Sequence, residues 1–214
     1  EAQRALDLAL FINRLDGEIP PALGQLTSLQ RLSLYANELT GGIPETLRAL
    51  TNLDELSLDV NELSGEIPAW LAELTSLQVL FLADNAFTGE LPPELGLLPS
   101  LNALFLERNQ LEGSIPEEIG SIATLTGLGL SGNQLSGTIP EALASLSFLN
   151  KLYLDNNAFT GEIPPALGAL SGLRELDLHG NALIGPLPVQ LTALPSLAYL
   201  DLSRNQLDGE LPES

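Results

Sequence analysis

The chain has 214 residues and is acidic, with 28 aspartates and glutamates, eight lysines and arginines, and a formal net charge of −20. This balance argues against nucleic acid and against an anionic membrane surface as partners, because both require a basic protein surface. There is no cysteine, which excludes a disulfide framework, and the longest apolar run, Leu8 to Ile12, is too short for membrane insertion.

An asparagine recurs at a constant step of 24 residues along the whole chain. A fixed period of this length is the signature of a solenoid, in which each repeat packs against its neighbours. We therefore predict a single domain over residues 1–214, with about nine repeats. The nine asparagines are Asn13, Asn37, Asn61, Asn85, Asn109, Asn133, Asn157, Asn181 and Asn205.

Every repeat predicts the same order of elements. Leu56 and Leu58, separated by one residue, predict a short strand with both side chains directed inward. Asn61 follows and is expected to bind backbone groups of its own turn and of a neighbouring turn. Gly65 permits a bend, and Pro68 can open a helical turn. An apolar pair spaced by three residues then predicts a short 3₁₀ helix or a single helical turn.

The repeat L-x-x-L-x-L-x-x-N-x-L-x-G-x-I-P-x-x-L-x-x-L-x-x, matched almost throughout by residues 53–76, resembles the plant-specific type of leucine-rich repeat. The resemblance implies an α/β repeat solenoid, a right-handed superhelix. Its parallel β-sheet lies on the concave side, with short second strands and 3₁₀ turns on the convex side. Similar proteins include receptor-like kinase ectodomains, polygalacturonase inhibitors and leucine-rich-repeat antifreeze proteins. The resemblance also implies an extracellular or cell-surface location.

The two ends of the repeat array are expected to be uncapped. Plant ectodomains of this type usually carry paired cysteines in their caps, and this chain has none. At one end Leu6, Leu8 and Leu10, and at the other Leu200 and Leu202, are predicted to face inward without a covering unit. We therefore expect frayed ends, missing flanking sequence, or end-to-end self-association through the uncapped repeats.

The strand residues beside each leucine pair are predicted to point outward on the concave face. Phe81 and Phe105 are lateral neighbours there, and they predict either a binding site or aromatic packing that stabilises the sheet. A polar and acidic strip follows, which suits a protein or glycan partner or is a solvated surface. Gly127 and Gly129 separate the two features as a strip without side chains. The candidate ligand-binding residues are Tyr35, Val79, Phe81, Phe105, Lys151, Tyr153, Asp155, Asp177, His179, Tyr199 and Asp201.

Neither catalysis nor metal binding is predicted for this face. Asp155, His179 and Ser203 occupy equivalent positions in successive repeats, but an open sheet surface supplies no oxyanion hole or shielded base. Asp155, Asp177 and Asp201 could offer oxygen ligands. They are expected to be spread over a flat surface with no loop to wrap an ion. No catalytic residue, metal ligand or cofactor is therefore assigned.

The predicted function is non-catalytic recognition of a protein, peptide or glycan across the concave face. The main alternative is a structural spacer or surface-adhesion repeat within a larger protein. Ice binding is a remote third alternative, suggested by the antifreeze relatives. It would need a regular threonine array, whereas the column of Thr40, Thr88 and Thr160 is interrupted in the other repeats.

Overall fold

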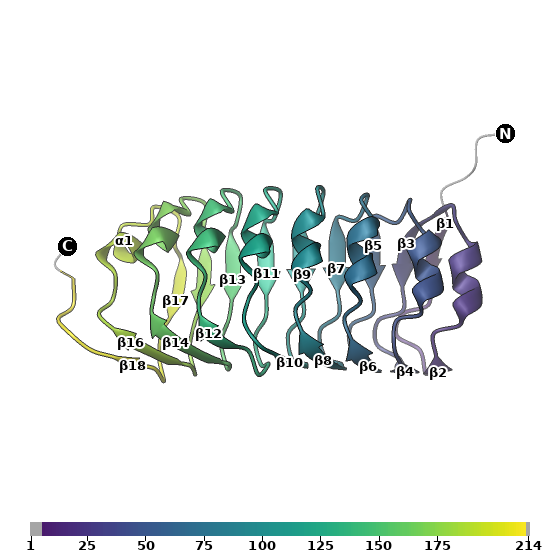
Figure 1. The fold of residues 1–214 in the computed structure, drawn as a ribbon, viewed down its shortest axis with the longest axis horizontal. Helices are drawn as coiled ribbons and strands as arrows, with labels where there is room; N and C mark the ends of the chain where they lie inside the picture. Colours follow the sequence, from purple (N-terminus) through teal and green to yellow (C-terminus); the bar gives the residue numbers. More distant parts are fainter. Residues whose placement is uncertain (1–5, 213–214) are drawn as a thin grey trace.

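The computed structural model describes residues 6–212, which form an elongated stack of similar turns (Figure 1). Each turn contributes one strand to a long sheet, one strand to a shorter sheet and, in most turns, a helical segment. In Figure 1 the helical segments lie in front of the long sheet, and the shorter strands run along the lower edge. The predicted α/β repeat solenoid is confirmed.

The long sheet has nine parallel strands in sequence order. Except at Leu6, which faces Leu29, facing residues are 24 positions apart, so that Leu56 lies beside Leu80, and Leu80 beside Leu104. The alternation of leucine with other residues therefore places one whole set of side chains in the core and leaves the other set on the opposite surface. The strands are β1 (Leu6–Ala9), β3 (Leu29–Ser33), β5 (Glu55–Ser57), β7 (Val79–Phe81), β9 (Ala103–Phe105), β11 (Gly127–Gly129), β13 (Lys151–Tyr153), β15 (Glu175–Asp177) and β17 (Tyr199–Asp201).

The shorter strands predicted for each repeat form two parallel sheets. The strands of the first are β2 (Asp16–Glu18), β4 (Glu38–Gly41), β6 (Glu62–Glu66), β8 (Ala86–Glu90) and β10 (Gln110–Glu112). The second contains β12 (Ser136–Thr138), β14 (Ala158–Glu162), β16 (Ala182–Gly185) and β18 (Gln206–Leu207). Hydrogen bonds still cross the break, because Gln134 N–H donates to Leu111 O at 2.7 Å and Ser136 N–H donates to Gly113 O at 2.7 Å.

The helical segments follow the Ile-Pro or Leu-Pro dipeptides, as predicted. Proline supplies an extended residue before each segment, and a leucine or isoleucine N–H closes the 3₁₀ segments. The 3₁₀ helices are η1 (Pro21–Gln25), η2 (Glu45–Ala49), η3 (Ala69–Glu73), η4 (Pro93–Leu97), η5 (Glu117–Ser121), η6 (Glu141–Ser145) and η7 (Pro165–Ala169), and the last segment is α1 (Val189–Thr192).

A single hydrophobic core runs along the stack and is filled by the recurring leucines and isoleucines, with Phe87 and Phe159 also fully buried. The leucines of the first turn are less buried than those of the middle turns. Leu10 is 39% exposed, and Leu6 and Leu15 are exposed as well. Within the described residues no turn packs over them, and an inward leucine is buried here only when turns lie on both sides.

The recurring asparagines form a continuous ladder, as predicted. Asn61 Nδ2 donates to Leu58 O in its own turn and to Leu34 O in the preceding turn, both at 3.0 Å. Its Oδ1 accepts the Leu39 N–H at 3.0 Å. The same three kinds of bond recur from Asn37 to Asn205. Each asparagine therefore stitches two adjacent turns together through otherwise unpaired backbone groups.

The residue directly before each ladder asparagine adopts a left-handed backbone conformation, which the sequence pattern did not reveal. Only two of these nine residues are glycines, although this region favours glycine. Val60, a β-branched residue, has φ of 56°. The full set is Ile12, Ala36, Val60, Asp84, Arg108, Gly132, Asn156, Gly180 and Arg204.

Candidate ligand-binding face

The candidate site lies on one face of the nine-stranded sheet, which we call the open face. The open face consists of the side chains that point away from the core, both in these strands and in the turns directly after them. The strand alternation that buries the leucines presents these residues to solvent. All eleven residues predicted to bind ligand belong to this face or its rim. The structure gathers them into three separate groups.

The first group lies at the N-terminal end and contains only one predicted residue, Tyr35. Its ring stacks on Phe11 with centroids 4.7 Å apart and an interplanar angle of 9°. Phe11 and Tyr35 follow strands β1 and β3, and on these strands Arg31 forms an ion pair with Asp7 at 2.5 Å. Strand β5 separates this group from Phe81, so Tyr35 does not join the central aromatic pair.

The second group is the central aromatic pair of Phe81 and Phe105, on the adjacent strands β7 and β9. The ring centroids are 5.5 Å apart at an angle of 66°, an edge-to-face arrangement that aromatic pairs favour. Both rings are half-buried, and neither enters the core. Val79 faces Ala103 at the start of the same strands. The pair thus offers an apolar contact surface in the middle of the stack.

The glycine strip next to this pair is covered, which corrects the sequence-based expectation of a bare surface. A Cβ placed on Gly127 would lie 2.9 Å from Phe105 Cζ, and one on Gly129 would lie 2.1 Å from Glu107 Oε1. Gly127 and Gly129 are accordingly buried. The long side chains of β9 and its following turn lean over the missing side chains of β11, so these glycines make room for Phe105 and Glu107.

Glu107 is the main residue here that the prediction missed. Its Oε2 is buried and has no hydrogen-bond partner within the described residues. Burial raises the pKa of this carboxyl, and a hydrogen bond from its own backbone N–H and the charge of Arg108 only partly oppose the rise. Arg108 itself forms a two-pronged ion pair with Asp84. Asp84 and Arg108 are 24 residues apart, so their opposite charges were a readable signal for this pair.

The third group begins at β13 and β15, where Lys151 and Tyr153 both contact Glu175. Lys151 Nζ lies 3.6 Å from Glu175 Oε1, and the Tyr153 hydroxyl donates a hydrogen bond to Glu175 Oε2. Burial and this acidic neighbour raise the pKa of Tyr153, which keeps the phenol protonated. Glu175 is therefore a shared acceptor that holds two of the predicted residues in place.

The rest of the third group converges on His179. Its Nδ1 lies 2.9 Å from Asp177 Oδ1, 3.9 Å from Asp155 Oδ2 and 4.0 Å from Asp201 Oδ2. Tyr199 donates to Asp177 at 3.2 Å and approaches Asp201 at 3.5 Å. The hydrogen bond to Asp177 is the largest cause of a raised pKa for His179, and the surrounding carboxylate charges add to it.

This convergence corrects the expectation that the carboxylates are spread apart. One ligand atom each from Asp155, Asp177 and His179 lies within 4.8 Å of the others, so these are the residues that could hold a cation. The Asp-His-Ser row does not form a nucleophilic triad. His179 Nε2 faces Asn156 Nδ2 at 3.0 Å, while the Ser203 N–H donates to Asp201 at 2.9 Å. His179 therefore has no hydrogen bond to a hydroxyl nucleophile in the described chain.

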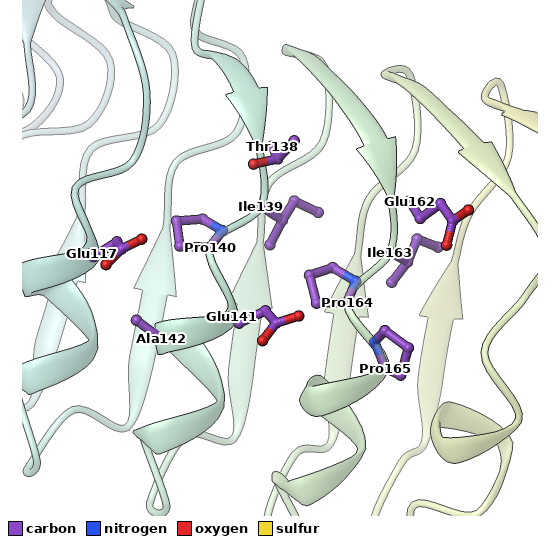
Figure 2. Close-up of a pocket in the computed structure, with 10 residues that line it drawn as sticks. All are labelled: Glu117, Thr138, Ile139, Pro140, Glu141, Ala142, Glu162, Ile163, Pro164 and Pro165. Atoms are coloured by element: carbon purple, nitrogen blue, oxygen red, sulfur yellow. The ribbon is translucent and has the colours of Figure 1, made fainter.

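Shallow grooves on another side of the solenoid lie between successive Ile-Pro segments. Figure 2 shows one of them, where Pro140, Pro164 and Pro165 lie among Glu117, Glu141 and Glu162. An equivalent groove recurs at the same repeat positions, lined by residues that include Pro68, Pro92, Pro93, Glu66 and Glu90. These grooves follow from the repeat itself, whereas the aromatic pair and the histidine cluster each occur at one place on the open face.

Comparisons with known proteins agree with this architecture. Models described as leucine rich repeat match residues 27–87 and 147–207, and a further leucine-rich-repeat model matches residues 100–122 and 124–146. A comparison with curated proteins finds no match. Within residues 6–212 no helix is long and apolar enough to cross a lipid bilayer.

Three solved structures illustrate the similarity. The leucine-rich-repeat ectodomain of the plant membrane receptor kinase GASSHO1/SCHENGEN3 from Arabidopsis thaliana, in complex with CASPARIAN STRIP INTEGRITY FACTOR 2, is 44% identical with a TM-score of 0.95, over 97% of this chain and 25% of that chain. The Arabidopsis receptor kinase HAESA, in complex with the peptide hormone IDA and the co-receptor SERK1, is 39% identical with a TM-score of 0.92, over 98% of this chain and 35% of that chain.

The third is a plant ice-binding protein, which is 37% identical with a TM-score of 0.84, over 94% of this chain and 65% of that chain. This chain thus spans about a quarter to a third of the length of the two receptor structures. The family models alone cover more than half of its residues. The repeat pattern, the stacked parallel sheets and these matches show that the chain belongs to the leucine-rich repeat family and is of the plant type.

Proposed function

We propose that the chain is a non-catalytic recognition module that binds a peptide or protein segment along its open face. The observation that carries the proposal is the pair of half-buried phenylalanines, Phe81 and Phe105, in the middle of this face. The inward layer is already filled by leucines, so these rings are not needed to complete the core. Partly exposed aromatic residues at the centre of a surface are typical binding hot spots.

The relatives support a peptide as the ligand. The receptor kinase HAESA is in complex with the peptide hormone IDA, and the plant peptide hormone receptor RGFR1, which is 38% identical to this chain, is in complex with RGF2. PEPR1, which is 37% identical, has a structure with AtPEP1. We infer a comparable ligand class here, and an extracellular or cell-surface location on the same grounds. The proposed ligand is basic, because a protein of net charge −20 attracts a cationic partner and repels an acidic one.

Selection from a library of random peptides displayed on mRNA tests this proposal. Peptides enriched on the wild-type protein would be synthesised with a fluorophore, and their affinities measured by fluorescence anisotropy. The double variant Phe81→Ala/Phe105→Ala should bind them at least about 30-fold more weakly, since truncating hot-spot residues costs about 2 kcal/mol or more. Affinity should also fall with added salt.

Phe148→Ala is the matched control, because Phe148 is 67% exposed but lies between η6 and β13, outside the open face. This variant should bind like the wild type. Enrichment of no peptide above a scrambled-repeat control protein would count against the proposal. Equal affinities for the double variant and the wild type would remove the aromatic pair from the binding site.

A further inference from the structure

A hollow at the ends of β7 and β9 combines aromatic rings with carboxylates. Its floor and walls come from three successive turns of the solenoid. Phe81 and Phe105 line this hollow together with residues that follow them in sequence, so the hollow is part of the open face. The lining residues are Asp59, Phe81, Ala83, Asp84, Phe105, Glu107 and Arg108.

The charges of this hollow do not balance. Asp84 is paired with Arg108, and that ion pair lowers the pKa of Asp84. Asp59 accepts a hydrogen bond from Ser57 Oγ at 2.8 Å, which is a neutral donor. Within residues 6–212, neither Asp59 nor Glu107 forms an ion pair at salt-bridge distance. Two carboxylates therefore face the hollow without a basic partner of their own.

One atom of the hollow also lacks a hydrogen-bond donor. Glu107 Oε2 is buried and unpartnered in the described chain, while Oε1 lies over Gly129 beside the Phe105 ring. A buried carboxylate oxygen without a donor is unfavourable, and native structures rarely leave one unpaired. Solvent does not reach this oxygen in the free protein, so a ligand group would donate an N–H to Glu107 after a small rotation of the carboxylate toward the hollow, and this would remove the deficit.

We propose that this hollow binds a cationic side chain, the ammonium of lysine or the guanidinium of arginine, carried by the peptide ligand; the proposal rests on the function inferred above. The cation would donate to Glu107 and lie over a face of Phe81 or Phe105, in the hollow that Asp59 also lines. Aromatic faces attract cations through their quadrupoles, and a hydrogen bond between opposite charges is among the strong ones.

Other ligand groups fit the hollow less well. An anionic group would meet three carboxylates around a single guanidinium that Asp84 already engages. A purely apolar side chain would fill the space between the rings but would leave Glu107 Oε2 without a donor and would cover the carboxylates of the hollow without pairing their charge. A cation is therefore the group whose charge and donors complement the residues present.

The test is an NMR titration of the whole chain, with labelled phenylalanine and glutamate, using small probes. The cationic probes are N-acetyl-lysine methylamide and N-acetyl-arginine methylamide. N-acetyl-norleucine methylamide is the neutral probe of similar length. Saturable shifts of the Phe81, Phe105 and Glu107 side chains are expected with the cations, at about tenfold higher affinity than with norleucine.

Glu107→Gln should reduce the affinity for the cationic probes by about tenfold and leave norleucine binding unchanged. Glu141→Gln is the control, since Glu141 lines a groove elsewhere on the solenoid. Equal binding of norleucine and the cations, no saturable shift, or unchanged cation binding by Glu107→Gln would overturn the proposal.

The failure of this proposal can be told apart from failure of the general function. If selected peptides bind the open face but lose no affinity in Glu107→Gln, the recognition function stands and the cation site is wrong. If no peptide is selected, the recognition function fails, and the small-probe titration still decides whether the hollow prefers a cation.

Discussion

His179 Nδ1 lies 2.9 Å from Asp177 Oδ1, two residues earlier on the same strand and turn, and the backbone N–H of His179 also donates to that oxygen at 3.1 Å. This double contact fixes the imidazole between the carboxylates of three successive turns. Asp155 and Asp201 lie at 3.9 and 4.0 Å from the same nitrogen. The ring therefore contacts carboxylates of three repeats on the open face. Its charge state governs the strength of these electrostatic interactions.

We predict that His179 titrates above its ordinary pKa of 6.5, chiefly because of the hydrogen bond to Asp177. The folded pKa is raised, so the stabilising contribution is fully present below the pKa of the unfolded chain and is lost as pH rises through the folded pKa. An NMR titration of the imidazole C2–H should give a midpoint above 6.5, and Asp177→Asn should lower it. A wild-type midpoint at or below 6.5 would contradict this assignment.

The asparagine ladder should be a major source of stability in the middle of the stack. Asn109 is 8% exposed and donates to Leu82 O and Leu106 O at 3.0 Å while accepting the Phe87 N–H at 3.0 Å. Asn109→Ala leaves these groups unpaired, and we expect a loss of about 2–4 kcal/mol in the free energy of urea unfolding. Asn13→Ala, in the exposed first turn, should cost less than about 1 kcal/mol. Equal losses would show that the ladder bonds are not what stabilises the centre.

The left-handed backbone conformation of Val60, directly before a ladder asparagine, predicts a stabilising substitution. Val60 has φ of 56° and is 47% exposed, so replacing it with glycine relieves backbone strain and removes little buried surface. A non-glycine residue in the left-handed region costs about 1–3 kcal/mol of strain, and glycine removes this cost. Glycine also loses more conformational entropy on folding, which cancels part of the gain. We therefore expect Val60→Gly to raise the free energy of unfolding by about 1 kcal/mol. Val189→Gly, at a similarly exposed valine without positive φ, should destabilise. Destabilisation of both variants alike would contradict this account of strain.

Close packing between helical segments predicts a position that accepts only glycine. A Cβ on Gly120 would lie 2.3 Å from Ala142 O, a backbone atom of the next turn. Gly120→Ala should therefore push η5 and η6 apart and cost about 1–3 kcal/mol. Ala144 occupies the equivalent position one repeat later and is already an alanine. Ala144→Gly should cost no more than about 1 kcal/mol. A neutral Gly120→Ala variant would show that the turns separate without penalty.

The repeat pattern alone was sufficient to predict the solenoid, the long parallel sheet and the ladder. Leu56 and Leu58 predict an inward-facing strand, and the recurrence of Asn61 at a fixed step predicts stacking, because both depend only on period and residue type. The left-handed conformation at Val60 was not predictable in this way. It occurs at a position where residue type varies, so no glycine pattern marked it.

The candidate site was predicted only in part, because side-chain direction is not contained in the spacing. The neighbouring positions of Phe81 and Phe105 follow from their separation of 24 residues. The way in which Glu107 leans over Gly129 depends on the empty space beside it, and the approach of three aspartates to His179 depends on side-chain rotamers. These side-chain positions depend on tertiary packing, which the repeat spacing does not specify.

The most direct test of peptide recognition on the open face uses the six phenylalanines of the chain as reporters. A selected peptide would be added to protein carrying labelled phenylalanine, and the ring resonances recorded by NMR. We predict large shifts for Phe81 and Phe105, and unchanged resonances for Phe148 and for the core residue Phe159. Shifts at Phe148 with Phe81 and Phe105 unmoved would contradict the account, because the peptide would then bind outside the open face.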